Sequence, residues 1–378
     1  MINFIENKNF NPERVSKRLF TSSDNIGVVA DFHKTLGNME TPLFKLDRLA
    51  HYLGIGKVFL KDESQRFGLN AFKSLGASYA MHKQIKKFPE IKVFCTATDG
   101  NHGRAVAWMA RKLRREALIY MPVGTIPERI KEIEKEGAEV ILTKYSYDIT
   151  VKMASKRVKE GNMLQSDNSW SLIQDTAWDG YEEIPMDIMR GYGTQIHEIT
   201  RQIEEENIDI LFLQSGVGSW AASVIMYILE EWESSPIFIG VEPHSSNCLY
   251  ESIKVGRRVS VQTDINTKMA GLDCGSLSTI AWEILDKAVF GTISISDKTS
   301  EKAMQVLASP IKDDPKVISG ESGASALGAL IELCISNKYR AFKKKINLNR
   351  TSKILLINTE GNTDPVNYDR VINIRTLL

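Results

Sequence analysis

The strongest constraint on the fold of this chain is the regular alternation of short apolar runs with amphipathic segments. Seven apolar runs are rich in β-branched residues and mostly end at Gly, Pro or Asp, which is typical of buried strands. They cover residues 57–62, 92–98, 116–122, 138–143, 209–215, 237–243 and 353–361. Helical periodicity occupies the intervals 103–114, 127–137 and 192–206. This strand–helix–strand order predicts an α/β fold with open parallel sheets and helices on both faces.

Charge and composition narrow the class of protein. The 48 Lys and Arg residues nearly balance the 47 Asp and Glu residues, so the net charge of +1 favours neither nucleic acid nor an anionic membrane as partner. No apolar run approaches the ~20 residues of a membrane span, and the opening MINFIENKNFNPERV lacks the apolar core of a secretory signal. Four cysteines without CxxC spacing indicate free thiols in a reducing cytoplasm. No His/Cys/Asp cluster has metal-ligand spacing, so we expect a cytoplasmic protein without a metal site.

Three predicted strands end in polar or glycine-rich turns. TATDGNHG (96–103) leads from a strand into a helix through a turn whose free backbone N–H groups suit a carboxylate or phosphate. FLQSGVGS (212–219) ends in two glycines that allow close backbone approach to an anion, followed by a serine hydroxyl. It matches neither GxxxxGK[ST] nor GxGxxG, so the usual nucleotide sites are not predicted. LLINTEGNTDP (355–365) places polar side chains at a strand end, where ligands bind in open α/β sheets.

A lysine in an unusual setting adds to these turns. Lys73 lies between Phe72 and the small-residue run SLGAS (74–78), at the expected start of an apolar helix. Because lysines are seldom buried, a single lysine is ordinarily a solvated surface charge. The GVGS segment alone is ordinarily the start of a helix. Together, however, a lysine amine, a phosphate-sized glycine loop and a polar Asn turn form the set that a pyridoxal phosphate Schiff base requires.

The order of the motifs FK, DGNHG, GVGS and TEGN resembles that of the fold-type II (tryptophan synthase β-like) pyridoxal phosphate enzymes, over roughly residues 40–370. The resemblance implies that Lys73 forms the Schiff base, that Phe72 packs beside the cofactor and that Asn101 meets the ring hydroxyl. Thr359 would face the pyridine nitrogen, and a hydroxyl there leaves that nitrogen largely unprotonated, which suits β-elimination. The cofactor phosphate would be held by Gly216, Val217, Gly218 and Ser219.

One departure from the common pattern indicates a subfamily. Dehydratases of this fold usually have Ser before GNHG, whereas this chain has Asp99, a candidate general base or partner for a cationic substrate. Four further segments accompany Asp99: SLIQDTAWDGY (171–181), MAGLDCG (269–275), SGESGA (319–324) and NTEGNTDP (358–365). With Asp99 they resemble the diaminopropionate ammonia-lyases over nearly the whole chain.

This second resemblance implies a reaction and a set of substrate contacts. The reaction is α,β-elimination of D- and L-2,3-diaminopropionate to pyruvate and two ammonia through an aminoacrylate intermediate. Asp99 would be the base for the D isomer and Asp175 the base for the L isomer, with Lys73 as an alternative base. The substrate would contact Thr98, Asp99, His102, Asp175 and Tyr181.

The resemblance also implies a homodimer of two-lobed subunits. The chain length agrees with two lobes, because 378 residues exceed the roughly 250–300 at which a single core stops growing. We predict a small domain over residues 92–190, carrying the Asn turn and the QDTAW segment, and a large cofactor-binding domain over 1–91 and 191–378. The cofactor would lie in the cleft between them.

Several of these residues also have an ordinary structural interpretation. Asp99 is a candidate helix cap and Asp175 a candidate turn residue. His102, in a GNHG turn, is more often a packed or backbone-bonded histidine than a base. Cys248 and Cys274 are expected to be buried free thiols, which touch if their two loops meet above the site.

Two alternative functions stay open. The first is a serine or threonine dehydratase of the same fold, against which Asp99 in place of Ser argues. The second is a non-catalytic protein that binds an amino acid or the cofactor. The presence of Lys73, Asn101, the GVGS loop and Thr359 argues against it.

Overall fold

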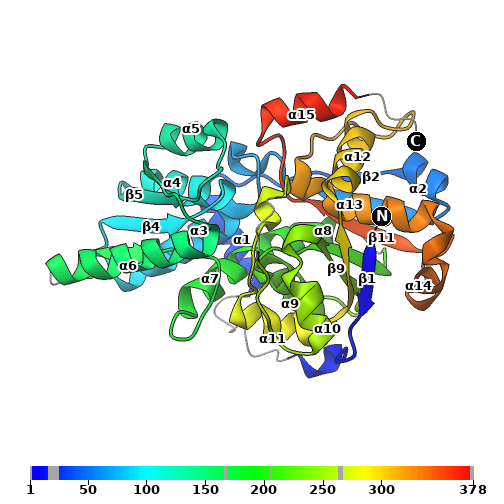
Figure 1. Cartoon of the computed structure of the whole chain (residues 1–378), viewed down its shortest axis with the longest axis horizontal. Coiled ribbons are helices and arrows are strands. Elements are labelled where there is room, and N and C mark those ends of the chain that lie inside the picture. The colour runs from blue at the N-terminus through cyan, green and yellow to red at the C-terminus, as the bar shows by residue number, and fades with distance from the viewer. Residues whose placement is uncertain (1, 16–24, 166–167, 205, 263–266, 375–378) are drawn as a thin grey trace.

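The computed structural model describes residues 2–15, 25–165, 168–204, 206–262 and 267–374, and its strands form two sheets (Figure 1). The larger sheet has seven strands: five central strands are parallel, and each edge strand is antiparallel to its neighbour. In spatial order these are β1 (Asn3–Glu6), β10 (Val289–Ile295), β9 (Ile237–Pro243), β8 (Ile210–Gln214), β11 (Lys353–Asn358), β3 (Lys57–Asp62) and β2 (Leu43–Lys45).

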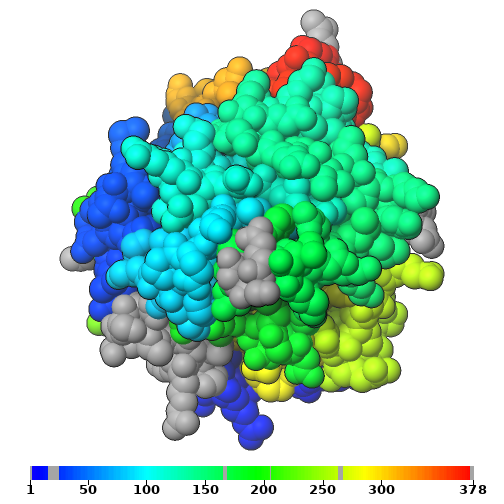
Figure 2. All heavy atoms as spheres, turned by 90° about the vertical axis from the view of Figure 1, so that its left-hand side faces the viewer, coloured from blue at the N-terminus to red at the C-terminus, as the bar shows by residue number. Residues whose placement is uncertain are grey.

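The smaller sheet has four strands, all parallel, and comes from one continuous part of the chain. In spatial order these are β6 (Glu139–Leu142), β5 (Glu116–Met121), β4 (Val93–Ala97) and β7 (Trp170–Leu172). Figure 1 shows this sheet and its helices on the left and the larger sheet on the right. Figure 2, seen from the smaller-sheet side, shows residues of this part, cyan to green, covering much of that face.

Helices cover both faces of the larger sheet, as the strand–helix–strand order predicts. Helices α2, α12 and α13 contribute to one buried apolar cluster, and α3, α7, α8, α9 and α11 to the other. The bounds of the helices are α1 (Ile26–Thr35), α2 (Asp47–Leu53), α3 (Lys73–Lys87), α4 (Asn101–Leu113), α5 (Pro127–Lys135), α6 (Tyr147–Gln165), α7 (Glu183–Gly191), α8 (Gly193–Gln202), α9 (Ser219–Glu231), α10 (Cys248–Val255), α11 (Thr279–Ala288), α12 (Asp297–Ala308), α13 (Glu321–Ile335), α14 (Arg340–Lys345) and α15 (Pro365–Ile372).

Strand β11 shows why an uninterrupted apolar run becomes a central strand. Successive side chains of a strand point to opposite faces of the sheet. Ile354 and Leu356 therefore pack into one apolar cluster, and Leu355 and Ile357 pack into the other. All four side chains are buried, because helices cover both faces of a parallel sheet and leave no face for polar residues.

Each of the seven predicted strands is present, with ends that differ by up to three residues. The sequence patterns did not predict β1, β2, β7 and β10. Strands β1, β2 and β7 have only three or four residues, too few to show a period. Strand β10 contains Gly291, where a Cβ atom would lie 2.5 Å from the carbonyl oxygen of Ile5 in the neighbouring strand β1. Among the helices formed by the described residues, none is long and apolar enough to cross a membrane.

Candidate active site

A cavity lies where the carboxyl ends of strands from both sheets face each other. It contains about 810 Å³ of empty space, a volume that includes open solvent. Its walls include the turn after β4, the segment after β7, the loops after β8 and β11 and the start of α3. The open α/β sheets therefore bring their strand ends together at one candidate site, as their topology favours.

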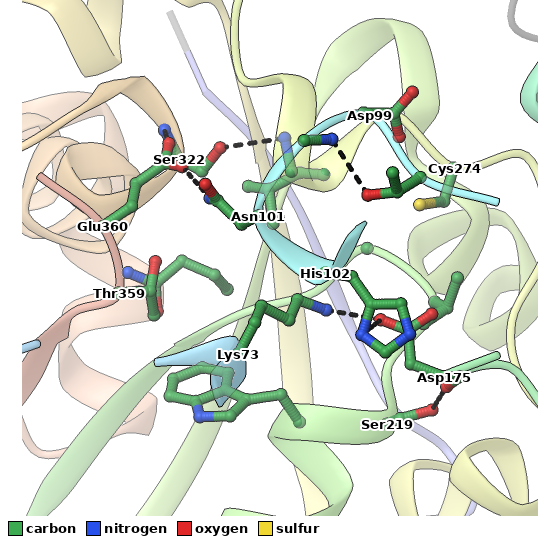
Figure 3. Close-up of a pocket in the computed structure, with 18 of the residues that line it drawn as sticks. Lys73, Asp99, Asn101, His102, Asp175, Ser219, Cys274, Ser322, Thr359 and Glu360 are labelled. Carbon is green, nitrogen blue, oxygen red and sulfur yellow. Dashed lines mark hydrogen bonds and ion pairs between the residues drawn. The ribbon is translucent and has the colours of Figure 1, made fainter. Parts of the chain in front are cut away.

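Lys73 is the first residue of α3, and its amine enters this cavity (Figure 3). The amine donates a hydrogen bond of 2.6 Å to Asp175 Oδ2 and lies 5.3 Å from the ring centroid of Phe72. Burial by itself lowers the pKa of Lys73, but the Asp175 carboxylate outweighs burial and raises it. Lys73 and Asp175 thus form a charged pair in a pocket that is largely shielded from water.

The two predicted acids have opposite electrostatic environments. Asp175 follows β7, and although burial opposes ionisation, the charge and hydrogen bond of Lys73 hold the pKa of Asp175 at about 2. Asp99 follows β4, where burial and then Asp273 raise its pKa to about 8. One cavity therefore holds a permanently ionised carboxylate and a second carboxyl group that titrates near neutral pH. A difference in pKa of this kind allows two carboxyl groups in one site to act separately as acid and base.

The turn between β4 and α4, residues 98–103, is called the Asn turn below. Thr98 shapes it, because its hydroxyl oxygen accepts hydrogen bonds from the backbone N–H groups of Gly100 (2.9 Å) and Gly103 (3.1 Å). Gly100 has φ +153°, a conformation that favours glycine. Because this turn is so constrained, Asp99 and Asn101 have fixed places on the cavity wall.

Asn101 points toward a carboxylate from the larger sheet. Its Nδ2 donates a 2.6 Å hydrogen bond to Glu360 Oε2, and Glu360 Oε1 accepts another, of 3.0 Å, from the backbone N–H of Ser322 (Figure 3). Glu360 directly follows Thr359, and both line the cavity. The Asn turn is therefore joined to the loop after β11 across the cleft between the sheets.

His102 is bonded to the backbone, as its ordinary interpretation predicts. Its Nε2 lies 2.7 Å from the carbonyl oxygen of Ile173, and since a carbonyl only accepts, Nε2 carries the proton. Within the described chain, Nδ1 has no hydrogen-bond partner; it lies 3.9 Å from Asp175 Oδ2. Burial lowers the pKa of His102, so the ring is a neutral neighbour that presents an unprotonated nitrogen to the site.

The glycine loop, residues 216–219, leads from β8 into α9. Gly218 has φ +84°, and a Cβ atom on Gly216 would lie 3.0 Å from the carbonyl oxygen of Gly271, so both positions favour glycine. The Ser219 hydroxyl donates a 2.6 Å hydrogen bond to the backbone carbonyl of Asp175. Across the described residues, the four backbone N–H groups of this loop donate to no protein acceptor. Free N–H groups at a helix N-terminus fit a phosphate group.

Phe72 forms an aromatic part of the cavity wall. The Phe72 ring packs against Tyr192 and Trp220, with centroids 5.0 and 5.3 Å away. The backbone N–H of Phe72 donates to the carbonyl of Thr359 at 3.3 Å, which holds the start of α3 beside the end of β11. A lysine amine, an aromatic wall and a phosphate cradle together fit pyridoxal phosphate. Among the described residues, no group of three or more His, Cys, Asp or Glu side chains is arranged to hold a metal ion.

The structure brings together all the predicted site residues except Tyr181. Phe72, Lys73, Thr98, Asp99, Asn101, His102, Asp175, Gly216, Val217, Gly218, Ser219 and Thr359 all line the cavity. Tyr181 does not contribute to this lining in the described chain. Its hydroxyl donates to the carbonyl of Leu172 (2.7 Å) and accepts from the backbone N–H of Gln174 (2.9 Å), and its ring stacks on Trp178. Tyr181 therefore supports the segment that carries Asp175 from behind, and our prediction of a substrate contact is corrected.

Arg129, Tyr147, Gln214 and Glu360 are among the cavity residues that sequence reasoning did not assign to the site. Glu360 had a signal, because it lies beside Thr359 in the same strand-end motif. Arg129 and Tyr147 follow β5 and β6 at some distance and belong to no motif. The hydroxyl of Tyr147 accepts a 2.9 Å hydrogen bond from Gln174, so a residue of the QDTAW segment holds it in place.

Cys248 and Cys274 are buried and free, as expected. Both approach Gly216: the Cys248 thiol donates to its carbonyl oxygen at 3.7 Å, and Cys274 Sγ would lie 3.3 Å from a Cβ atom on Gly216. The two loops therefore do meet beside the glycine loop. Burial raises the pKa of both thiols, which keeps them protonated and unreactive.

Comparison with known proteins places this site in a family. The family model described as pyridoxal-phosphate dependent enzyme matches residues 34–356. The diaminopropionate ammonia-lyase of Escherichia coli K12 is 39% identical over 98% of this chain and 96% of its own length. That of Salmonella typhimurium is 42% identical over 91% of each chain. A crystal structure of the Escherichia coli enzyme with an aminoacrylate–PLP azomethine reaction intermediate superimposes with a TM-score of 0.91 at 38% identity, covering 99% of this chain and 97% of that one.

Proposed function

Since the chain belongs to the pyridoxal-phosphate dependent enzymes and has diaminopropionate ammonia-lyases as near full-length relatives, we propose that it catalyses α,β-elimination of the β-amino group of 2,3-diaminopropionate, after which hydrolysis releases the α-amino group. The substrate and one water yield pyruvate and two ammonia, from either enantiomer. The single observation that carries the proposal is the pair of carboxyl groups, Asp99 and Asp175, in the cavity that Lys73 enters. Two acids beside a lysine suit a substrate that carries an extra ammonium group.

The residues of the cavity have separate tasks toward pyridoxal phosphate. The cofactor, when bound, supplies an aldehyde that condenses with amino groups and a ring that accepts the electrons left when the Cα proton departs. Lys73 would supply the amine that holds the cofactor covalently, and the N–H groups of residues 216–219, which line the same cavity, would hold its phosphate. Asn101 would contact the ring hydroxyl and Thr359 the ring nitrogen. Phe72 and Trp220 enclose the cavity and keep water from it.

Asp175 and Asp99 accept the Cα proton from opposite isomers. Asp175 is ionised and 2.6 Å from the Lys73 amine, so a proton acceptor stands beside the point where the substrate amine replaces that lysine. We assign it to the L isomer. Asp99 lies on the Asn turn, on another wall of the cavity, and serves the D isomer once it has lost its own proton. Each carboxylate that is not the base for a given isomer attracts the β-ammonium group of the substrate.

Pyruvate release by the purified, cofactor-loaded protein tests this proposal. D- and L-2,3-diaminopropionate are compared with L-serine and L-threonine, whose products are pyruvate and 2-oxobutyrate. We expect fast release from both diaminopropionate enantiomers and little from the hydroxy amino acids. Product mainly from serine or threonine would identify a dehydratase instead. Lys73→Ala is expected to abolish turnover and the visible absorbance of the bound cofactor; retained turnover would exclude Lys73 as the cofactor lysine.

We also propose that the enzyme is a cytoplasmic homodimer. Free cysteines, three of them buried, support a reducing compartment, and the resemblance to the diaminopropionate ammonia-lyases is what suggests the dimer. Size-exclusion chromatography with light scattering tests the assembly: about twice the 42.5 kDa chain mass is expected. A monomeric mass at micromolar concentration would contradict it.

A further inference from the structure

Arg129 lines the cavity that Lys73 enters but has no role in the reaction proposed above. It is the third residue of α5. It also lines a second depression on the outer side, called the outer hollow here, together with Asn362, Thr363 and Pro365 of the larger-sheet side. Arg129 thus forms part of the wall between the cavity and the surface.

The aliphatic part of Arg129 lies against the Asn turn. A Cβ atom on Gly100 would be 2.8 Å from Arg129 Cδ and 3.5 Å from its Nε, so the side chain crosses directly over the Gly100 backbone. Gly100 stands between Asp99 and Asn101, the two residues that the turn presents to the cavity. The backbone of this turn therefore packs against the Arg129 side chain, and a larger residue at Gly100 would displace that side chain.

The guanidinium group reaches the larger-sheet side of the cleft. Arg129 Nη2 lies 3.4 Å from the Thr363 hydroxyl, in the loop that follows β11. The Thr363 hydroxyl is 3.4 Å from Glu360 Oε2, the oxygen that also accepts the 2.6 Å hydrogen bond from Asn101. This series of contacts begins at Gly100 and ends at Asn101, the next residue of the Asn turn. Arg129, Thr363, Glu360 and the Asn turn form one closed set of contacts across the cleft.

The charge of Arg129 acts on the same turn. Charged and titratable side chains surround Asp99 on several elements: Lys73, Arg129, Tyr147, Asp175, Asp273 and Cys274. Burial and the two acids raise the pKa of Asp99, whereas Arg129 and Lys73 lower it. Lys73 is itself paired with Asp175 at 2.6 Å, so its charge is largely balanced. Arg129 then remains the main opposing cation.

We propose that Arg129 is a positioning residue of this site, which ties the Asn turn to the loop after β11 and holds positive charge beside Asp99. Its charge favours Asp99 as a proton acceptor, and its contacts keep Asn101 where the cofactor ring is held. The effect on Asp99 rests on the proposed elimination reaction. The effect on the Asn turn does not, because it concerns cofactor binding alone.

Three variants of the cofactor-loaded enzyme separate the charge from the contacts. Arg129→Gln removes both, Arg129→Lys keeps the charge without the planar fork, and Lys131→Gln is the control. Lys131 is exposed on the same helix and lines the outer hollow but not the cavity, so its loss removes an equal charge from α5. Two quantities are measured for each: the pH profile of kcat/KM for both enantiomers, and the affinity for pyridoxal phosphate from quenching of tryptophan fluorescence.

In Arg129→Gln, we expect the acidic limb of the D-isomer profile to move up by about one pH unit, so that kcat/KM at pH 7 falls about tenfold. The L-isomer profile should keep its position. Arg129→Lys should keep the D-isomer profile near that of the wild type. Both Arg129 variants should bind the cofactor about two- to tenfold more weakly, and Lys131→Gln should change neither quantity.

An unchanged D-isomer profile in Arg129→Gln, or equal shifts for both enantiomers, would overturn the assigned effect on Asp99. Cofactor affinity equal to wild type in both Arg129 variants would overturn the assigned effect on the Asn turn. Failure of the proposed function has a different signature, because the wild type would then release pyruvate from neither enantiomer. The affinity measurement would still decide whether Arg129 positions the turn.

Discussion

The ratio of D-isomer to L-isomer activity should rise steeply with pH in the unmodified enzyme. A carboxyl group accepts a proton only when ionised, and a raised pKa means that this ability is lost as pH falls through the raised value. The pKa of Asp99 is raised to about 8, whereas that of Asp175 is held at about 2. Asp99 is then about one-tenth ionised at pH 7 and about nine-tenths ionised at pH 9, while Asp175 is fully ionised at both. The ratio of kcat/KM values should therefore increase about tenfold over this interval.

The ratio is the quantity to measure because it cancels other titrations. Enantiomers have identical amine pKa values, and Lys73 and the cofactor serve both, so their ionisation changes numerator and denominator equally. Pyruvate formation is coupled to a lactate dehydrogenase reaction, with each enantiomer well below its KM. Buffers of constant ionic strength keep the screening of surface charges the same at every pH.

Two results would refute this reasoning. A ratio that stays constant between pH 7 and pH 9 would mean that one group serves both isomers, or that Asp99 is not a base. The Asp99→Asn variant supplies the control: it should lose D-isomer activity preferentially and with it the pH dependence of the ratio. Equal loss on both isomers would contradict the assignment of Asp99 to one isomer.

The remaining predictions concern the framework of the site. Gly218→Ala places a Cβ at φ +84° against Leu285, so we expect weaker cofactor binding and a loss of about 1–2 kcal/mol in unfolding free energy, measured by fluorescence titration and urea denaturation. Leu355→Ala removes a fully buried side chain of β11 and should cost about 2–5 kcal/mol by the same denaturation measurement. Glu198 accepts hydrogen bonds from the buried Lys61 and Arg66, which with burial opposing them hold its pKa at about 2, so Glu198→Gln should cost about 3–5 kcal/mol. Because that pKa is lowered by folding, the contribution of Glu198 is fully present above its unfolded pKa and disappears as pH falls toward 2; a wild-type-like acid denaturation midpoint in the variant would contradict this.

Local patterns in the sequence were sufficient for the central strands and most of the site. Strands such as β3, β8 and β11 are buried on both faces, so their apolar runs are continuous and recognisable without any tertiary information. Parallel strands of one sheet also align their carboxyl ends, so the turns after β8 and β11 were expected to meet, and the family resemblance implied that the turn after β4 faces them. Lys73, Asp99, the glycine loop and Thr359 do line one cavity.

Tertiary structure decided the features that depend on distances across the cleft. The order of acidity of Asp99 and Asp175 follows from which one lies 2.6 Å from Lys73, and no spacing along the chain expresses that distance. The orientation of Tyr181 away from the cavity and the reach of Arg129 to Thr363 are of the same kind. The period of apolar residues along a helix or strand shows which of its faces is buried, because this period depends only on the residues of that one element. The contacts between two sheets depend on how whole elements pack, and therefore only the folded chain determines the charges and partners at its active site.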